Sequence, residues 1–138
     1  MEIFINKLMV ILAFGFTGFI LWIIYLANTG GQSIFFDFVR ALPFGDKLGH
    51  FGLFGLLTLL MNFACKLKTI KIGPVSVYLG AILVFSFAII EELSQFFVVS
   101  RTLDITDVLA DIVGIVFFSG LTFLINKWRI KNESDEIG

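Results

Sequence analysis

Residues 8–27 form a run of twenty residues that contains no charged side chain. A transmembrane α-helix needs about 20 mostly apolar residues, because each residue rises about 1.5 Å through a hydrocarbon core about 30 Å thick. The run is longer than the apolar core of a signal peptide and lacks a clear small-residue cleavage site, so we expect it to remain as an anchor. The most constraining feature of this sequence is therefore a membrane span.

Three more apolar runs follow the first, and each is long enough to cross a bilayer. Pro74 opens the third run, a position suited to the first turn of a helix. Charged residues make up 15% of the chain, against about 25% in a typical soluble domain. The sequence thus predicts an all-α, polytopic membrane protein, a bundle of four transmembrane helices at about residues 8–27, 48–65, 74–97 and 105–125. Residues 1–126 form its single domain, and residues 127–138 form a polar tail that we expect to fray.

Lysine and arginine indicate the orientation, because cytoplasmic loops of membrane proteins carry an excess of these residues. With the N-terminus inside, seven of the ten basic residues fall on the cytoplasmic side and three on the outer side. We therefore expect a multi-pass protein of the bacterial cytoplasmic membrane, with both termini in the cytoplasm. The three outer basic residues are Arg40, Lys47 and Arg101.

Residues 28–45 join the first two spans on the outer side and contain the stretch "SIFFDFVRALPF". This stretch is too short to span the membrane and too aromatic for an ordinary loop. A short amphipathic helix in the headgroup region, or a re-entrant segment that covers the bundle, fits its composition. A hydrophobic loop packed on the helix ends is the remaining alternative.

Charge and cysteine content limit the other functional classes. The net charge is −1 and the pI is about 5.7, so nothing indicates a nucleic-acid partner. Cys65 is the only cysteine, which excludes an internal disulfide and argues against a thiol-based metal site. We interpret Cys65 as a small apolar residue at a helix end. Membrane lipids are the expected partners, and neither a metal nor another cofactor is expected.

The charged residues of the spans come together only when the topology is considered. The stretches "DKLGH", "EELSQ" and "RTLDITDVLAD" all fall at the outer ends of spans two, three and four. Helical spacing places Asp46 and His50 on one face, and Glu92 and Gln95 on another. The adjacent Glu91 is turned by about 100° from Glu92, so we expect only one of these two carboxylates to face the cluster.

Span four carries a stripe of three carboxylates, Asp104, Asp107 and Asp111, at spacings i, i+3 and i+7. Over seven residues the stripe descends about 10 Å into the bilayer. An Asp, Lys or Arg at a helix centre costs roughly 2.5–3.5 kcal/mol on insertion scales, so such groups need partners or water. Asp111 and His50 lie deepest and are therefore the most costly.

On the predicted outer side, seven acidic residues face the three basic ones, an excess of four negative charges. We therefore expect some carboxylates to be protonated or to bind a cation. Two structural explanations are weighed against a functional site: Asp104 suits the N-cap of span four, and the whole cluster could be an ion-pair lock between helices. Because ionisable residues inside a membrane are functional candidates by default, we favour a ligand site. Its predicted residues are Asp46, Lys47, His50, Glu92, Gln95, Arg101, Asp107 and Asp111.

Small residues of spans two and four are interpreted as packing positions. Gly49, Gly52 and Gly55 recur at three-residue spacing in span two, and Gly114 and Gly120 lie in span four. Small side chains allow helix backbones to approach each other closely in membranes.

Three ordered motifs, "DKLGHFGLFG", "EELSQFF" and "SRTLDITDVLADIVG", resemble the VanZ-like family of small bacterial membrane proteins over about residues 46–125. That family begins one helix with Asp-Lys-x-x-His and ends the next with Glu-x-x-Gln. An Arg then precedes Asp-x-x-x-Asn and a nearby Gly. The matching residues are Asp46, Lys47, His50, Glu92, Gln95, Arg101, Asp107 and Gly114.

The sequence departs from this pattern at one position, where Asp111 stands in place of the usual Asn. The resemblance implies a multi-pass helical membrane protein. It also implies an antibiotic-resistance role at the cell envelope, because the founding member is linked to resistance against the glycopeptide teicoplanin.

Two functional hypotheses from different classes follow, of which we favour binding over catalysis. In the first, Arg101, Lys47 and His50 bind the phosphate or carboxylate of a lipid-linked cell-wall precursor or an amphiphilic drug, and the aromatic outer segment shields its chain. In the second, the protein is an enzyme acting on such a lipid. His50 is then base or nucleophile, Asp46, Glu92 or Asp107 orients it, and Arg101 stabilises developing charge. A carboxylate-rich Mg²⁺ site is an open variant of the second hypothesis. An ion-coupled transporter or an assembly scaffold are further alternatives, although four spans are few for a transporter.

Overall fold

The computed structural model describes residues 2–137, and their side chains from residue 5 to residue 135. Within this range, four helices are long and apolar enough to cross a membrane, at Ile5–Thr29, Gly45–Ala64, Leu79–Phe97 and Ile105–Asp135. The prediction of a four-helix transmembrane bundle is therefore confirmed. The elements in chain order are α1 (Glu2–Thr29), α2 (Ile34–Ala41), α3 (Gly45–Ala64), β1 (Thr69–Ile72), β2 (Val75–Tyr78), α4 (Leu79–Ser94), the 3₁₀ turn η1 (Gln95–Phe97) and α5 (Ile105–Ile137).

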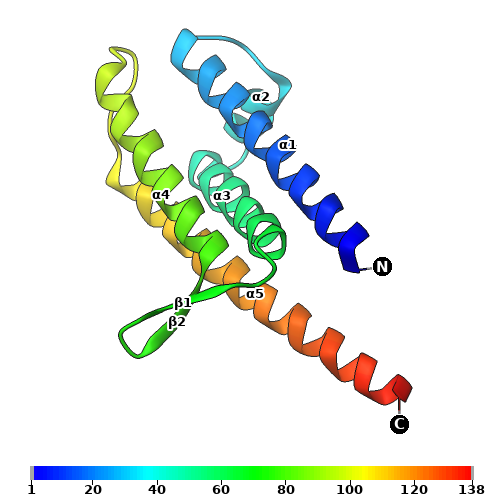
Figure 1. Cartoon of the computed structure of the whole chain (residues 1–138). Coiled ribbons are helices and arrows are strands. Elements are labelled where there is room, and N and C mark those ends of the chain that lie inside the picture. The colour runs from blue at the N-terminus through cyan, green and yellow to red at the C-terminus, as the bar shows by residue number, and fades with distance from the viewer. Residues whose placement is uncertain (1, 138) are drawn as a thin grey trace.

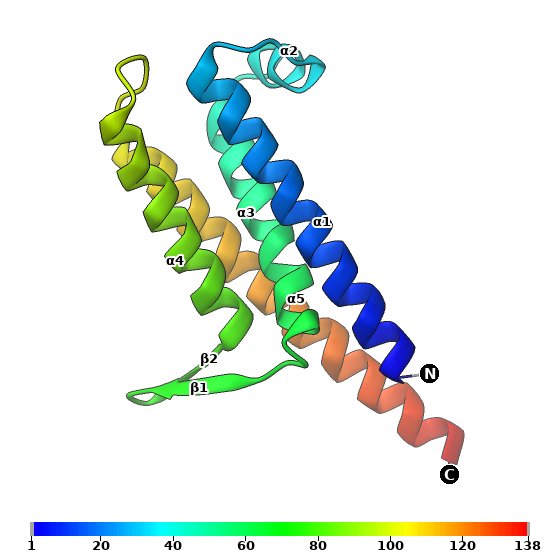
Figure 2. The ribbon, with the colours of Figure 1, turned by 45° about the horizontal axis from the view of Figure 1, so that its top comes forward.

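Helix α3 is the centre of the bundle and contacts α1, α2, α4 and α5. Both ends of the chain lie at the same end of the bundle, and α2 lies at the opposite end, where α1 ends and α3 begins (Figures 1 and 2). Ile20, Leu57 and Val84, from three different helices, are almost fully buried and form the apolar core with their neighbours. The end that carries α2, the start of α3, the end of α4 and the start of α5 is called the site end below.

One of the alternatives for residues 28–45, a short helix, is confirmed by α2. Ser33 caps its first turn, because the Ser33 hydroxyl oxygen accepts a hydrogen bond from the Phe35 amide at 3.0 Å. None of its eight residues, all of them described, is buried. Phe35 packs edge-on against Phe19 of α1, with ring centroids 6.2 Å apart. A helix of this length extends only about 12 Å, so it covers the end of the bundle and cannot cross a membrane.

The predicted start of span three at Pro74 is wrong. Residues 69–78 form an antiparallel β-hairpin, and α4 begins only at Leu79. Gly73 has a φ of 60° and precedes Pro74 in a two-residue turn, an arrangement that favours a hairpin. The alternation of "TIKI" and "VSVY" has the period of two typical of strands, and this pattern, not the proline, was the informative signal.

The predicted frayed tail is also wrong, because α5 continues without a break to Ile137. No Gly or Pro interrupts residues 121–137, and Leu, Lys, Arg and Glu, which are good helix formers, recur along this stretch. Arg129 and Glu133 lie one turn apart on this extension, with Nε and Oε1 3.9 Å apart. With 33 residues α5 is about 50 Å long, more than the hydrocarbon thickness, so one end extends beyond the bilayer.

Close packing of α3 on α5 depends on two of the predicted packing glycines. A Cβ at Gly114 would lie 2.4 Å from the Phe51 carbonyl oxygen, and a Cβ at Gly55 would lie 2.4 Å from the Phe118 ring. In contrast, a Cβ at Gly52 or Gly120 would meet no atom of the described chain within 4 Å. The close approach aligns the first turns of α3 with those of α5, which carry the polar residues of both helices.

Candidate functional site

The site end is held together by a backbone contact at the start of α3. A Cβ at Gly45 would lie 1.7 Å from the Val39 carbonyl oxygen, so only glycine fits where α2 meets α3. Phe44, just before it, has a left-handed φ of 55°. This tight connection fixes the direction of the first turn of α3, which carries Asp46 and Lys47.

Lys47 connects α3 to the beginning of α5. Its Nζ donates to Asp46 Oδ2 at 3.2 Å, to Asp104 Oδ2 at 2.8 Å and to Asp107 Oδ1. Asp104 is also the N-cap of α5, as predicted, because its Oδ1 accepts from the Thr106 amide at 2.9 Å. The hydrogen bond from Lys47, followed by those from Thr106, holds the pKa of Asp104 well below its usual range.

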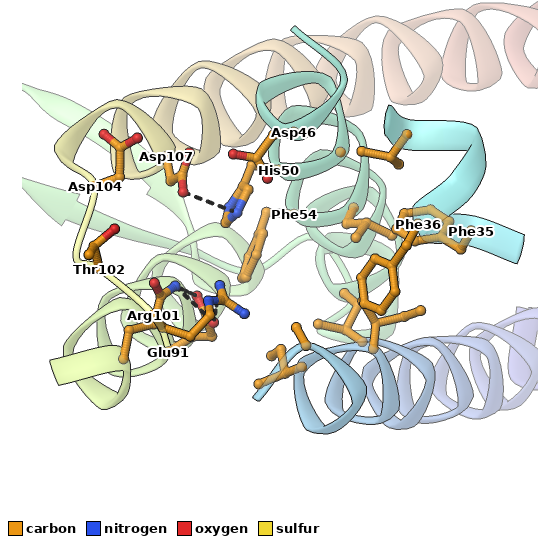
Figure 3. A pocket seen from close by; sticks show the side chains of 18 of the residues that line it. Phe35, Phe36, Asp46, His50, Phe54, Glu91, Arg101, Thr102, Asp104 and Asp107 are labelled. Carbon is orange, nitrogen blue, oxygen red and sulfur yellow. Dashed lines mark hydrogen bonds and ion pairs between the residues drawn. The ribbon is translucent and has the colours of Figure 1, made fainter. Parts of the chain in front are cut away.

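His50 lies between two carboxylates of α5. Its Nδ1 is 3.0 Å from Asp111 Oδ1. On the other side of the ring, Nε2 is 3.6 Å from Asp107 Oδ2, the contact drawn in Figure 3. The first distance is a hydrogen bond, and the second is too long for one. Asp111 is only 1% exposed, and its Oδ2 has no hydrogen-bond partner among the described residues. Phe54 covers the histidine, with the two rings nearly parallel and centroids 6.0 Å apart.

At the end of α4, both Glu91 and Glu92 are buried in the cluster. Gln95 Nε2 donates to both carboxylates at 3.1–3.2 Å. Glu92 Oε1 accepts from the Asp104 amide at 2.7 Å, and Arg101 lies 3.9 Å from Glu91. The expectation that only one glutamate faces the cluster is wrong, because α5 covers one side of the helix end and the Arg101 loop covers the other.

A pocket of about 320 Å³ opens beside these polar groups. One wall is apolar and comes from α1, α2 and the middle of α3, including Ile20, Ile24, Phe35 and Phe36. The other wall is polar, and His50, Glu91, Arg101 and Asp107 point toward the same space (Figure 3). The pocket is therefore amphipathic, with its apolar and polar walls supplied by different helices.

The structure brings all eight predicted site residues into one cluster. Asp46, His50, Gln95, Arg101 and Asp107 line the pocket. Lys47, Glu92 and Asp111 support those residues through the hydrogen bonds described above. The acidic residue Asp37 stands apart, because it forms an exposed pair with Arg40 at 4.0 Å on α2.

Sequence reasoning missed the contribution of α1 and the exposed loop residues Ser100 and Thr102 to this pocket. Ile20, Ile23 and Ile24 line it, but they are apolar residues in an apolar span. No spacing or residue type distinguishes them from residues that face lipid. The aromatic run of α2 was the only sequence signal for the apolar wall.

The cluster carries more negative than positive charge. Its six carboxylates are Asp46, Glu91, Glu92, Asp104, Asp107 and Asp111, and its basic side chains are Lys47, His50 and Arg101. Even with His50 protonated, three carboxylates are left without a cation of their own. Buried charges without compensation are costly, so this imbalance requires protons, a bound cation or water.

Comparison with known proteins gives one match. A model of the family described as VanZ/LLP1 matches residues 3–126, which include the first three spans, the start of the fourth and the whole cluster. No curated protein and no solved structure matches the chain.

Proposed function

The chain belongs to the VanZ/LLP1 family, and from that premise we propose that its amphipathic pocket binds an amphiphile with a charged headgroup. The ligand class is a lipid-linked cell-envelope precursor or an amphiphilic glycopeptide antibiotic. In the orientation expected from the lysine and arginine distribution, the pocket opens at the outer surface of the bacterial cytoplasmic membrane.

The observation that carries this proposal is the contrast between the two walls of one pocket. An acyl or prenyl chain gains free energy when it lies against apolar side chains such as Phe35 and Ile24, at about 25 cal/mol per Å² buried. A headgroup at the opposite wall meets Arg101, His50 and Gln95. Binding sites for small molecules typically combine an apolar lining with a few convergent polar groups, as this pocket does.

Arg101 is the residue best suited to hold an anionic headgroup. Among the described side chains, its one ion pair is the 3.9 Å contact with Glu91, which is too long for a hydrogen bond. A guanidinium has five N–H donors in a planar fork that matches the oxygens of a phosphate or carboxylate. A headgroup at Arg101 would lie on the same side of the pocket as the His50 ring.

The test is ligand retention by the purified full chain. Native mass spectrometry is run with a polyprenyl phosphate, a lipoglycopeptide and phosphatidylcholine as separate probes. We expect Arg101→Gln to reduce retention of a charged probe at least tenfold, whereas Arg40→Gln, on the exposed surface of α2, leaves it unchanged. Equal retention by both variants, or equal retention of phosphatidylcholine, would contradict the proposal.

An enzyme acting on the same lipid is a second candidate, favoured by the surroundings of His50. Asp111 at Nδ1 orients the ring and leaves Nε2 on the side of Asp107, which lines the pocket. A histidine held in this way can serve as general base or nucleophile. Incubation of the purified protein with the polyprenyl phosphate distinguishes the two: release of inorganic phosphate that is lost in His50→Gln supports the enzyme, and unchanged lipid supports the binder.

A further inference from the structure

We propose that Asp46, His50 and Asp107 bind one divalent cation at the polar wall of the pocket, where the sequence assigned no metal ligands and left a Mg²⁺ site open only as a variant of the enzyme hypothesis. One ligand atom of each residue lies within 4.8 Å of the corresponding atoms of the other two. A divalent cation lies about 2.0–2.6 Å from nitrogen and oxygen ligands, so a single ion can reach all three after small side-chain movements.

The contact between His50 and Asp107 fits two ligands of one ion better than a direct bond. Nε2 and Oδ2 lie 3.6 Å apart, which is too long for a hydrogen bond. Two ligand atoms at about 2.1 Å from a shared ion, at tetrahedral or octahedral angles, lie about 3–3.5 Å apart. Asp107 therefore presents an oxygen to the space that an ion would occupy.

Asp111 supplies an independent argument for a ligand at this place. A histidine that binds a metal usually donates its other ring N–H to a carboxylate, which fixes the tautomer and the ring direction. Asp111 does this from a fully buried position, with Oδ1 3.0 Å from His50 Nδ1. Its Oδ2 is buried without a hydrogen-bond partner in the described part of the chain. A cation on the far side of the imidazole would compensate this buried charge.

Lys47 and the cation use different oxygens of Asp107. Lys47 Nζ contacts Oδ1 of Asp107, whereas His50 faces Oδ2. Lys47 also contacts Oδ2 of Asp46, so the lysine and the ion share this second aspartate. One lysine does not compensate the surrounding carboxylates, because Asp104 and Asp111 add two more negative charges close by. The cluster therefore keeps uncompensated negative charge that a cation beside Lys47 can balance.

The donor set of two carboxylates and one imidazole, without thiolate, suits Mg²⁺, Mn²⁺ or Zn²⁺. Three protein ligands leave coordination positions open toward the pocket, which all three residues line. If the proposed function holds, these positions take phosphate or carboxylate oxygens of the headgroup. The cation would then explain how an acid-rich wall accepts an anion.

The first measurement uses Mn²⁺ alone, added to the purified full chain in detergent and followed by electron paramagnetic resonance. We expect one saturable site with a coupling to one imidazole nitrogen. Asp46→Asn and Asp107→Asn should each weaken binding at least tenfold. Asp111→Asn should weaken it about 10–100-fold, the usual effect of removing such a supporting carboxylate. Asp37→Asn is the matched control on α2 and should bind like the unaltered chain.

Absence of saturable Mn²⁺ binding, or of the nitrogen coupling, in the folded, unaltered chain would overturn the proposal. Binding that survives Asp46→Asn and Asp107→Asn would also overturn it. Because Asp46 is largely exposed, with 69% of its side chain accessible, Asp46→Asn keeps the test valid if the buried variants do not fold.

The second measurement repeats the lipid-retention assay with and without chelator. Loss of retention in the chelator indicates a cation that joins protein and headgroup. Mn²⁺ binding without lipid retention would reject the proposed function and leave the cation site. Lipid retention that is insensitive to chelator, in a chain that fails to bind Mn²⁺, would reject the cation site and leave the proposed function.

Discussion

At the site end of the bundle, six carboxylates and three basic side chains lie together, and four of the carboxylates are buried. At the opposite end, next to the hairpin, Lys66, Lys68 and Lys71 are exposed. The buried polar contact there is between neutral groups, Asn62 and Thr122, with Nδ2 and Oγ1 3.2 Å apart. Among the side chains that the structure describes, helices α3 and α5 thus carry buried charge at one end and only neutral buried polar groups at the other.

The difference shows where the chain buries charged groups at a free-energy cost that the packing of the helices does not require. Exposed lysines at a helix end meet water and headgroups at little cost. The hairpin beside these lysines also exposes the side chains of Ile70, Ile72 and Val75. Contact with a membrane surface is enough to explain the position of the lysines. Buried carboxylates such as Asp111 cost several kcal/mol unless compensated, so the site end, and not the hairpin end, is where a ligand site is proposed.

The largest effect is expected when the charge balance of the site end is broken. Lys47→Met leaves Asp46, Asp104 and Asp107 without their shared cation. We expect a loss of about 3 kcal/mol in the free energy of unfolding, the low end for breaking a buried ion pair, because the Lys47 side chain is 31% exposed. Denaturation of the purified protein in mixed detergent measures the loss.

The matched control is Lys71→Met on the exposed hairpin. This variant should change the unfolding free energy by less than about 0.5 kcal/mol, as is usual for surface substitutions. Similar losses of unfolding free energy in the two variants would show that the site end and the hairpin end do not differ in their dependence on a lysine.

A smaller effect is expected from the close contact of α3 and α5. Gly114→Ala places a methyl group against the Phe51 carbonyl oxygen and should cost about 1–2 kcal/mol, as overpacking does. Gly120→Ala, where a Cβ meets no described atom within 4 Å, should be neutral or stabilise the helix by up to about 1 kcal/mol. Thermal unfolding of both variants measures these changes in stability. A Gly114→Ala variant as stable as the unaltered chain would show that the site end does not depend on the close packing of α3 on α5.

The smallest effect concerns the pH dependence of Asp104. Its pKa is lowered in the folded state by Lys47, so its ionisation stabilises the fold above the unfolded-state pKa of about 3.9, and this contribution is lost as pH falls through the lower folded-state pKa. Asp104→Asn keeps an N-cap and removes the charge. The difference in thermal midpoint between the two proteins should be constant from pH 6 to 8 and shrink below about pH 4. A difference that varies between pH 6 and 8 would contradict this assignment.

The membrane class and the four spans were predictable from the sequence, because a bilayer demands long apolar runs. The convergence of Asp46 and His50 with Asp107 was also predictable, since the starts of the two helices that carry them had to meet at one surface. The hairpin was missed because Pro74 suits both a helix start and a turn. The contribution of α1 was missed because Ile20 looks like any lipid-facing residue until the helices are packed.

Whether the charge at the site end serves a ligand or only locks the helices is the central question, and one set of four variants answers it. His50→Gln, Glu92→Gln, Arg101→Gln and Asp107→Asn each replace one ionisable side chain of the cluster by a neutral polar one. Each variant is measured for accumulation in the membrane and for retention of the polyprenyl phosphate. Our account predicts accumulation close to that of the unaltered chain, with retention reduced at least tenfold in each. Disappearance of all four variants from the membrane would show that the cluster is a structural lock and would contradict the account.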